Sequence, residues 1–186
     1  MHRSYAPDIT TQMILPDEEA QHCVRVLRLK EGEEVEVVDG KGHLHLCRIL
    51  NANAKNCAVE IVGTTDVKPH WGCRITVAIA PTKNMDRMEW MAEKVTEMGV
   101  DRIVPLLCRY SERKVLKTER LRKILVAAMK QSLKATLPQL DDRAARRTAV
   151  HCLLRPRNPE ARLREGMPSG ERRDDSGGTR RRLQPA

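Results

Sequence analysis

The stretch that most constrains the fold lies between residues 74 and 106. RITVAIA (74–80) is a run of apolar and β-branched residues, which is typical of a strand buried on both faces of a parallel sheet. An amphipathic helix over 84–98 follows, with Gly99 as its C-cap, and RIVPL (102–106) has the pattern of a second strand. Strand, helix and strand in this order predict a βαβ unit, and hence an α/β fold.

The charges of this helix do not suit its own dipole. Lys83 and Arg87 lie at its positive N-terminal end and Glu97 lies near its negative C-terminal end. Each placement is unfavourable by roughly 0.3–1 kcal/mol. We therefore expect these side chains to be held by contacts elsewhere in the protein or by a ligand.

A second helix is predicted over residues 118–137, where apolar residues recur at helical spacing and Pro138 ends the pattern. Upstream, residues 1–68 predict a small barrel. A helix is expected over 15–30, a hairpin over 33–50 around Asp39-Gly40-Lys41-Gly42, and a third strand over 57–63. Residues 67–72 read as a linker between this unit and the α/β unit.

Net charge differs sharply along the chain. The whole sequence carries +9, which favours a polyanionic partner such as nucleic acid. Residues 142–186 hold 12 Arg, no Lys and 6 acidic residues, and they contain no Ile, Phe, Tyr or Trp. Such a segment buries too little apolar surface to offset its ordering entropy, so the Arg-rich tail is predicted to be disordered.

Several classes of protein are disfavoured by what the sequence lacks. No apolar run approaches the roughly 20 residues that span a bilayer, and the N-terminus does not resemble a signal peptide, so no membrane and a cytoplasmic location are expected. The six cysteines are scattered and predict buried reduced thiols. His43 and His45 share one face of a strand, but without a recognised third ligand no metal site is predicted.

Single motifs leave the function open. Arg25 and Arg28 lie three residues apart on one face of a predicted helix, which by itself usually indicates a solvated face. PTKN (81–84) follows a strand where α/β sheets place ligands, but it has no glycine-rich loop for a dinucleotide.

The motifs taken together are more specific. H-C-V-R-V-L-R (22–28), D-G-K-G (39–42), P-T-K-N-x-D-R-x-E-W (81–90), E-K-x-x-E-M-G (93–99), S-E-R (111–113) and A-M-K-Q-S-L-K (128–134) occur in order. In this combination residues 1–141 resemble the RsmE family, which methylates N3 of one uridine in the 16S rRNA of the small ribosomal subunit.

The resemblance implies a PUA-like RNA-binding barrel over 1–68 and a SPOUT methyltransferase domain that begins at 74–141. It also implies S-adenosylmethionine as cofactor, a homodimer, and a role in ribosome biogenesis. RNA contacts would come from Arg25, Arg28, Lys30, Lys83 and Arg87. Positions near the active site would be Lys94, Glu97, Gln131 and Lys134. No catalytic base is assigned.

The chain departs from the family after residue 141. The family's G-P-E-G loop and its L-R-x-E-T-A stretch, which form the knot and hold the cofactor, do not occur in this sequence. The SPOUT domain is therefore expected to be incomplete, with no cofactor-binding residues assigned. One hypothesis is a reading-frame shift near Asp142, and the other is a genuine basic arm for RNA. Translation of the other two frames beyond codon 142 would distinguish them.

Two functions from different classes follow. The chain is either an RsmE-type methyltransferase by descent, or an RNA-binding fragment without catalytic activity. A third alternative is that the chain is an α/β protein unrelated to this family. If the tail supplies no knot, apolar residues such as Met88 and Leu125 are expected to stay partly exposed.

Overall fold

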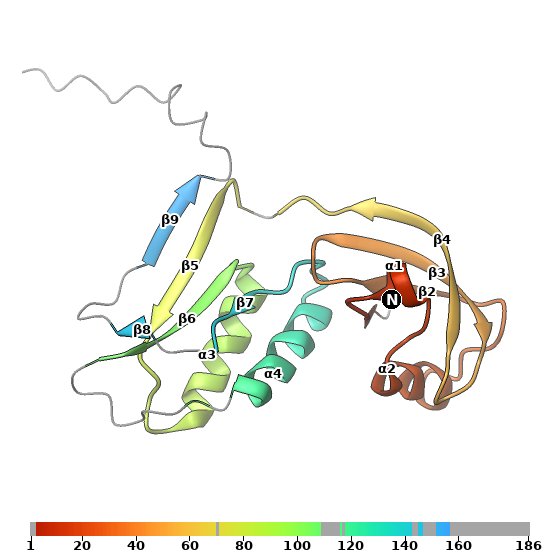
Figure 1. Cartoon of the computed structure of the whole chain (residues 1–186), viewed down its shortest axis with the longest axis horizontal. Coiled ribbons are helices and arrows are strands. Elements are labelled where there is room, and N and C mark those ends of the chain that lie inside the picture. The colour runs from red at the N-terminus through yellow and green to blue at the C-terminus, as the bar shows by residue number, and fades with distance from the viewer. Residues whose placement is uncertain are drawn as a thin grey trace, which may run out of the picture.

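The computed structural model describes residues 3–69, 71–108, 116 and 118–142, and the backbone of 145–146 and 152–156. Two domains lie side by side, joined by the chain between β4 and β5 (Figure 1). No helix among the described residues is long and apolar enough to cross a membrane.

The N-terminal domain is built on one four-stranded sheet with short helices beside it. Its elements are β1 (Arg3–Tyr5), α1 (Ile9–Gln12), α2 (Asp17–Gln21), the π-helix η1 (His22–Val26), β2 (Glu34–Val38), β3 (His43–Asn51) and β4 (Ala58–Asp66). The strand order is β1-β2-β3-β4, with β1 parallel to β2 and the other pairs antiparallel. The predicted hairpin and third strand are confirmed.

The N-terminal segment pairs with both edges of this sheet. β1 pairs with β2 at one edge, and Ile14 forms a bridge with Ala58 at the start of β4 on the other. Leu15 N–H donates to Cys57 O and Val59 N–H donates to Met13 O, at 3.0 and 2.9 Å. The segment therefore closes the sheet into the barrel that the sequence predicts.

The barrel encloses an apolar core. The fully buried members include Ile9, Leu15, Val37, Ile49 and Val59, together with the thiols of Cys23, Cys47 and Cys57. Burial raises the pKa of the Cys47 thiol to about 11, so it stays protonated at neutral pH. These three cysteines match the predicted buried thiols, but Cys73 and Cys108 are only half-buried, so the prediction is wrong for those two.

The predicted helix over 15–30 is wrong in extent. α2 ends at Gln21 and continues as the π-helix, whose last turn is closed by Leu27 N–H donating to His22 O at 3.0 Å. Arg28 then has a φ of 57°, which reverses the chain and returns Leu29 to the barrel core. The core therefore holds Cys23 and Leu29 on either side of the reversal, and a straight helix could not bury both.

The C-terminal domain contains the predicted βαβ unit. Its elements are β5 (Cys73–Ile79), α3 (Met85–Met98), β6 (Arg102–Leu107), α4 (Thr118–Gln131), β7 (Gln139–Leu140), β8 (Ala145–Arg146) and β9 (Cys152–Pro156). β5 and β6 are parallel, as predicted. Asn84 caps α3 by accepting the N–H of Asp86 at 2.8 Å, and Gly99 ends the helix with a φ of 84°.

Helices α3 and α4 cover one face of this sheet and cover each other. Met88, Leu121 and Leu125 are at most 1% exposed, and Ile75, Val77 and Ile79 of β5 pack against the same cluster. The expected partial exposure is therefore wrong for Met88, Leu121 and Leu125, because α3 and α4 pack against one another as well as against the sheet. Three further residues of these faces are only partly buried, as expected: Met91, Val95 and Ile124. The opposite face of β5 is not covered, so the prediction of a strand buried on both faces is also wrong.

Helix α4 ends at Gln131, six residues before the predicted end. Lys134 N–H donates to Met129 O at 3.0 Å, and Leu133 adopts a φ of 55°. Residues 132–138 therefore leave the helix as a compact turn, which we call the junction segment. The N–H groups of residues 132–134 still bond back to α4, whereas Ala135 O and Leu137 N–H bond to the other domain.

The junction segment docks on the turn between β2 and β3. Leu137 N–H donates to Gly40 O at 2.8 Å, and Gly42 N–H donates to Ala135 O at 3.0 Å. Beneath them, Val38 of the barrel packs with Met129 and Ala135 in a small buried cluster. The two domains are thus joined by backbone hydrogen bonds over a shared apolar core.

An ion pair reinforces this contact. Lys130 Nζ of α4 lies 2.5 Å from Glu19 Oε1 of α2, and the Glu19 side chain is only 9% exposed. A buried carboxylate without a partner costs free energy, so the folded state requires Lys130 as the partner of Glu19.

Two strands lie within residues 142–186, where the sequence predicts disorder. β9 pairs antiparallel with β5 over Cys73–Val77, and β8 pairs with β6 (Figure 1). The prediction fails for these two strands, because the edge of β5 offers unpaired backbone groups that a short strand satisfies. Residues 157–186 lie outside the described residues.

The docking turn should be sensitive to a single methyl group. Gly40 has a φ of 77°, and a Cβ there would lie 3.0 Å from a ring carbon of Tyr5 and 3.2 Å from Cβ of Leu137. Gly32, with a φ of 87°, has nothing within 4 Å of such a Cβ. In chemical denaturation we expect Gly32→Ala to cost about 1–2 kcal/mol from backbone strain alone, and Gly40→Ala to cost at least about 1 kcal/mol more from crowding. Equal losses would contradict the docked arrangement.

Packing between α3 and α4 gives a second expectation. Leu125→Ala should lower the free energy of unfolding by about 2–5 kcal/mol, because the side chain is fully buried. Met98→Ala, at a side chain that is 61% exposed on α3, is the control and should cost under about 0.5 kcal/mol. Rapid hydrogen exchange throughout α3 and α4 in the unmutated protein would show that this core does not form.

Candidate functional site

The cations predicted to contact RNA in the barrel lie on one short reversal of the chain. Arg25 is in η1, Arg28 follows it and Lys30 comes two residues later, and all three are exposed. The reversal is anchored by Cys23, whose Sγ lies 3.3 Å from Ser4 Oγ in the core. π-Helical turns are rare in proteins, and many of those that occur lie at functional sites. In this one, exposed cationic side chains surround the buried thiol of Cys23.

Arg28 is unusual because it is a non-glycine residue with a positive φ. That conformation costs an L-residue roughly 1–2 kcal/mol, which the surrounding fold must offset. The strain is consistent with a side chain kept for its chemistry, since glycine would fit the backbone better.

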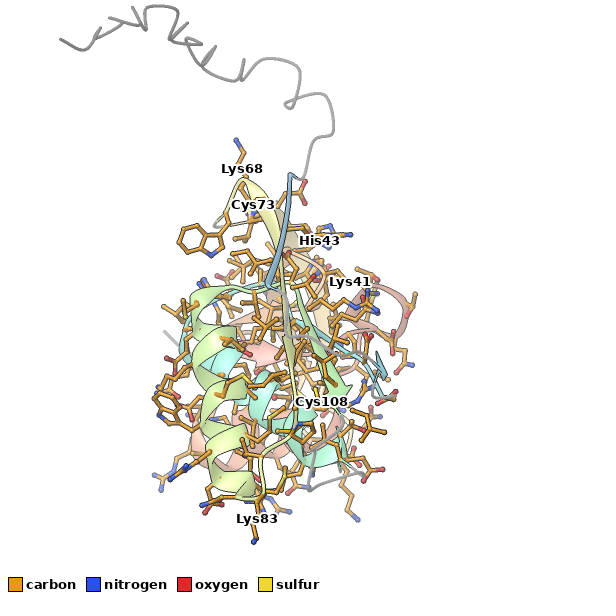
Figure 2. All side chains as sticks on the ribbon, turned by 90° about the vertical axis from the view of Figure 1, so that its left-hand side faces the viewer. Lys41, His43, Lys68, Cys73, Lys83 and Cys108 are labelled. Carbon is orange, nitrogen blue, oxygen red and sulfur yellow. The ribbon has the colours of Figure 1, made fainter. Side chains whose placement is uncertain are left out.

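Lys83 and Arg87 are placed at the opposite end of the C-terminal domain from the docking turn. Both are exposed around the first turn of α3, and Lys83 precedes the Asn84 cap. Figure 2 shows Lys83 at the foot of α3, well away from Lys41 and His43. The five predicted RNA contacts therefore occupy two separate regions.

The residues predicted near the active site fall into two groups. Lys94 Nζ lies 2.8 Å from Glu93 Oε1 and 2.9 Å from Glu97 Oε1, so Glu97 near the end of α3 is neutralised within its own helix. The hydrogen bond to Glu93 is the largest of the contacts that raise the pKa of Lys94, which is thus held as a cation. Gln131 is the last residue of α4, and Lys134 lies within the junction segment.

A cleft of about 1030 Å³ opens between the two domains. It lies against the uncovered face of the sheet, where Arg74, Thr76 and Ala78 of β5 alternate with the residues that contact the helices. Lys41, His43 and Asp66 line the barrel side of the same cleft. Sequence reasoning missed this site because the alternation within RITVAIA is masked by the small and β-branched residues of both faces.

The floor of the cleft carries a fixed ion pair. Arg102 donates from Nε and one terminal nitrogen to the two carboxylate oxygens of Asp141, at 2.9 and 2.7 Å. This bidentate contact raises the pKa of Arg102 further and ties β6 to the residue that follows β7.

Beside the cleft, the β2–β3 turn brings together three side chains that can bind metal. His43 Nδ1 lies 2.6 Å from Asp39 Oδ2, and this hydrogen bond raises the pKa of His43. Burial tends to raise the pKa of Asp39, but bonds from His43 and from two backbone N–H groups lower it overall. Burial lowers the pKa of His45, which favours the neutral ring. Asp39 thus offers a third possible ligand that the sequence analysis did not consider.

Comparison with known proteins assigns both domains. Residues 15–62 match the family described as "RNA methyltransferase PUA domain", and residues 69–153 match the one described as "RNA methyltransferase domain". The ribosomal RNA small subunit methyltransferase E of Aquifex aeolicus is 30% identical over 126 residues, which are 64% of this chain and 53% of that protein. The chain is thus similar to this enzyme over about two thirds of its own length. The methyltransferase match reaches residue 153, further than the sequence motifs indicated.

Solved structures show the same fold. A protein of Porphyromonas gingivalis described as a "probable rRNA-methyltransferase" has a TM-score of 0.74 and 44% identity, over 77% of this chain and 60% of that one. A methyltransferase of Legionella pneumophila, solved with bound SAM, has a TM-score of 0.66 and 25% identity, over 78% and 63% of the two chains. The PUA-like and SPOUT-type folds expected from the sequence are confirmed. The chain spans about half the length of the curated relatives it matches.

The reversal at Arg28 allows a test of the predicted RNA contacts. Arg25→Ala combined with Arg28→Ala should weaken RNA binding and reduce the slope of log affinity against log salt by about one to two. Arg28→Gly removes the same charge while relieving the positive φ, so it should weaken binding and raise stability together. Binding is measured by fluorescence anisotropy over a salt series. An unchanged slope in the double variant would remove these residues from the interface.

Proposed function

We propose that the protein is by descent an enzyme of S-adenosylmethionine-dependent methylation of small-subunit ribosomal RNA, with N3 of a uridine in 16S rRNA as the acceptor, and that the 186-residue chain is inactive as it stands. The observation that carries the proposal is the docking of the barrel on the methyltransferase domain through the junction segment. An RNA-binding module fixed against an RNA methyltransferase domain can present one nucleotide at a constant distance from its anchoring contacts.

In this proposal the barrel, over residues 1–68, contacts the RNA backbone with Arg25, Arg28 and Lys30. Lys83 and Arg87 supply further phosphate contacts from the start of α3. With two Trp and two Tyr in the chain, recognition would rest on phosphates and shape more than on stacking of bases. The cytoplasm is the proposed location, and 16S rRNA or the small subunit the proposed partner.

Methylation at N3 of uracil requires removal of the N3 proton and alignment of that nitrogen with the methyl donor. Lys94 is held as a cation by Glu93 and Glu97, so in this arrangement it is suited to donate a hydrogen bond rather than to accept a proton. Gln131 and Lys134 remain proposed as neighbours of the active site. The base is unassigned.

The cofactor does not fit the described residues as a bound group. The two segments expected to hold the methionine and adenosine moieties do not occur in the sequence, and no other part of the domain described here offers a glycine-rich cradle. No residue of this chain is therefore given a role that depends on a bound cofactor.

A second function follows from the same observation. The barrel is closed on both edges and has its own core, so it can bind RNA whether or not the cofactor site is complete. The alternative proposal is thus an RNA-binding fragment without catalytic activity. A homodimer is also proposed, and the exposed Trp90 and Met98 of α3 offer apolar surface for one.

A chimera separates the two proposals. In one arm residues 1–186 are tested for S-adenosylmethionine binding by calorimetry and for methyl transfer to small subunits that lack the modification. In the other, residues 142–186 are replaced by the corresponding C-terminal part of the Aquifex relative. We expect RNA binding in both proteins and methyl transfer only in the chimera. A chimera that binds the cofactor but leaves the RNA unmodified would contradict the methylation proposal, and turnover by residues 1–186 would contradict the fragment.

A further inference from the structure

The strongest unexplained feature of the barrel is the cluster formed by Asp39, His43 and His45. Each residue offers one ligand atom, and these atoms all lie within 4.8 Å of one another. The two histidines are separated by one residue of β3 and so face the same side of the sheet, while Asp39 directly follows β2 and contacts His43 across the turn. We propose that this cluster is a binding site for a divalent transition-metal ion, with Zn²⁺ the preferred occupant.

His45 provides the observation that points to a ligand. Its ring is 2% exposed, and its Nδ1 lies 2.9 Å from Thr64 Oγ1. Its Nε2 is buried and has no hydrogen-bond partner among the described residues. With Nδ1–H donating to the threonine, Nε2 carries a lone pair directed at nothing, whereas a cation would satisfy it. Metal-binding histidines are commonly oriented in this way, by a bond from the ring nitrogen that does not touch the metal.

The turn fixes the carboxylate that completes the site. Asp39 Oδ1 accepts the N–H groups of Lys41 and His43 at 2.7 and 3.1 Å, which leaves Oδ2 directed at the His43 ring. A role in holding the turn explains Asp39 and His43, but it leaves the orphaned nitrogen of His45 unexplained. The metal site accounts for all three.

The surroundings suit a cation. Lys41, the nearest basic residue in sequence, has its Nζ 3.3 Å from the carbonyl oxygen of Pro7. Asp66 stands at the rim, with Oδ1 3.7 Å from His43 Nε2, and adds negative charge. His43 is 44% exposed at its side chain and lines the cleft, so an ion and its water ligands can enter from solvent.

The ligand set selects the metal. Two imidazoles and one carboxylate are typical of zinc, at distances of about 2.0–2.2 Å, with a fourth position left for water. The site lacks the set of oxygen ligands that Mg²⁺ or Ca²⁺ prefers. Ligands at those distances lie at most about 4.4 Å apart, so the cluster needs only a small side-chain adjustment to close on one ion.

Metal titration of the full 186-residue chain tests the proposal. After treatment with a chelator, Zn²⁺ is added in a calorimeter, and Co²⁺ is used as a visible absorption probe. We expect one equivalent to bind, and the Co²⁺ spectrum to show nitrogen and oxygen ligands without thiolate charge-transfer bands. Zn²⁺ should also raise the melting temperature.

Variants at accessible positions assign the ligands. His43→Ala alters a half-exposed side chain, and Asp39→Asn keeps the Oδ1 that holds the turn, so both should fold. Each should weaken Zn²⁺ binding at least about tenfold and abolish the thermal shift. His22→Gln, at a histidine of the same domain outside the cluster, is the control and should bind as the unmutated chain does.

Three outcomes would overturn the site. They are the absence of saturable binding, an affinity unchanged in both His43→Ala and Asp39→Asn, and a Co²⁺ spectrum dominated by thiolate. None of these results bears on rRNA methylation, so the two proposals can fail separately.

Discussion

The arrangement of this protein depends on one docked turn. The peptide groups of Gly40 and Gly42 exchange hydrogen bonds with the junction segment, and the apolar contact of Val38 with Met129 and Ala135 lies directly below. The turn can approach this closely only because Gly40 has no side chain. This contact sets the position of one domain relative to the other, and with it the positions of both walls of the cleft.

The sequence was sufficient to predict those elements that are determined by residues close together in the chain. The hairpin around Asp39-Gly40-Lys41-Gly42 and the βαβ unit ending at Gly99 were predicted correctly, because turn glycines and hydrophobic period act over a few residues. The ends of helices were harder. α4 stops at Gln131, and the chain then turns so that Ala135 O and Leu137 N–H bond to the barrel. A partner about 95 residues earlier in the chain leaves no mark on the local pattern.

In the candidate site, too, features set by neighbouring residues were predictable and features set by distant contacts were not. Arg25, Arg28 and Lys30 are exposed, as their sequence context suggested, but the positive φ of Arg28 could be seen only in three dimensions. The Asp39–His43–His45 cluster could have been suspected, since Asp39 is four residues from His43 on the far side of a predicted hairpin. The cleft could not, because it depends on which face of β5 the helices leave uncovered.

Closure of the barrel by its own N-terminal segment also sets an order of assembly. Every strand pair that closes the barrel lies within residues 3–66, so the barrel can fold as a unit before the junction segment emerges from the ribosome. The C-terminal domain then emerges beside a surface that is already folded. The junction segment, made after α3 and α4, meets a preformed turn, and the nascent barrel thereby acts as a template that decides where α4 stops.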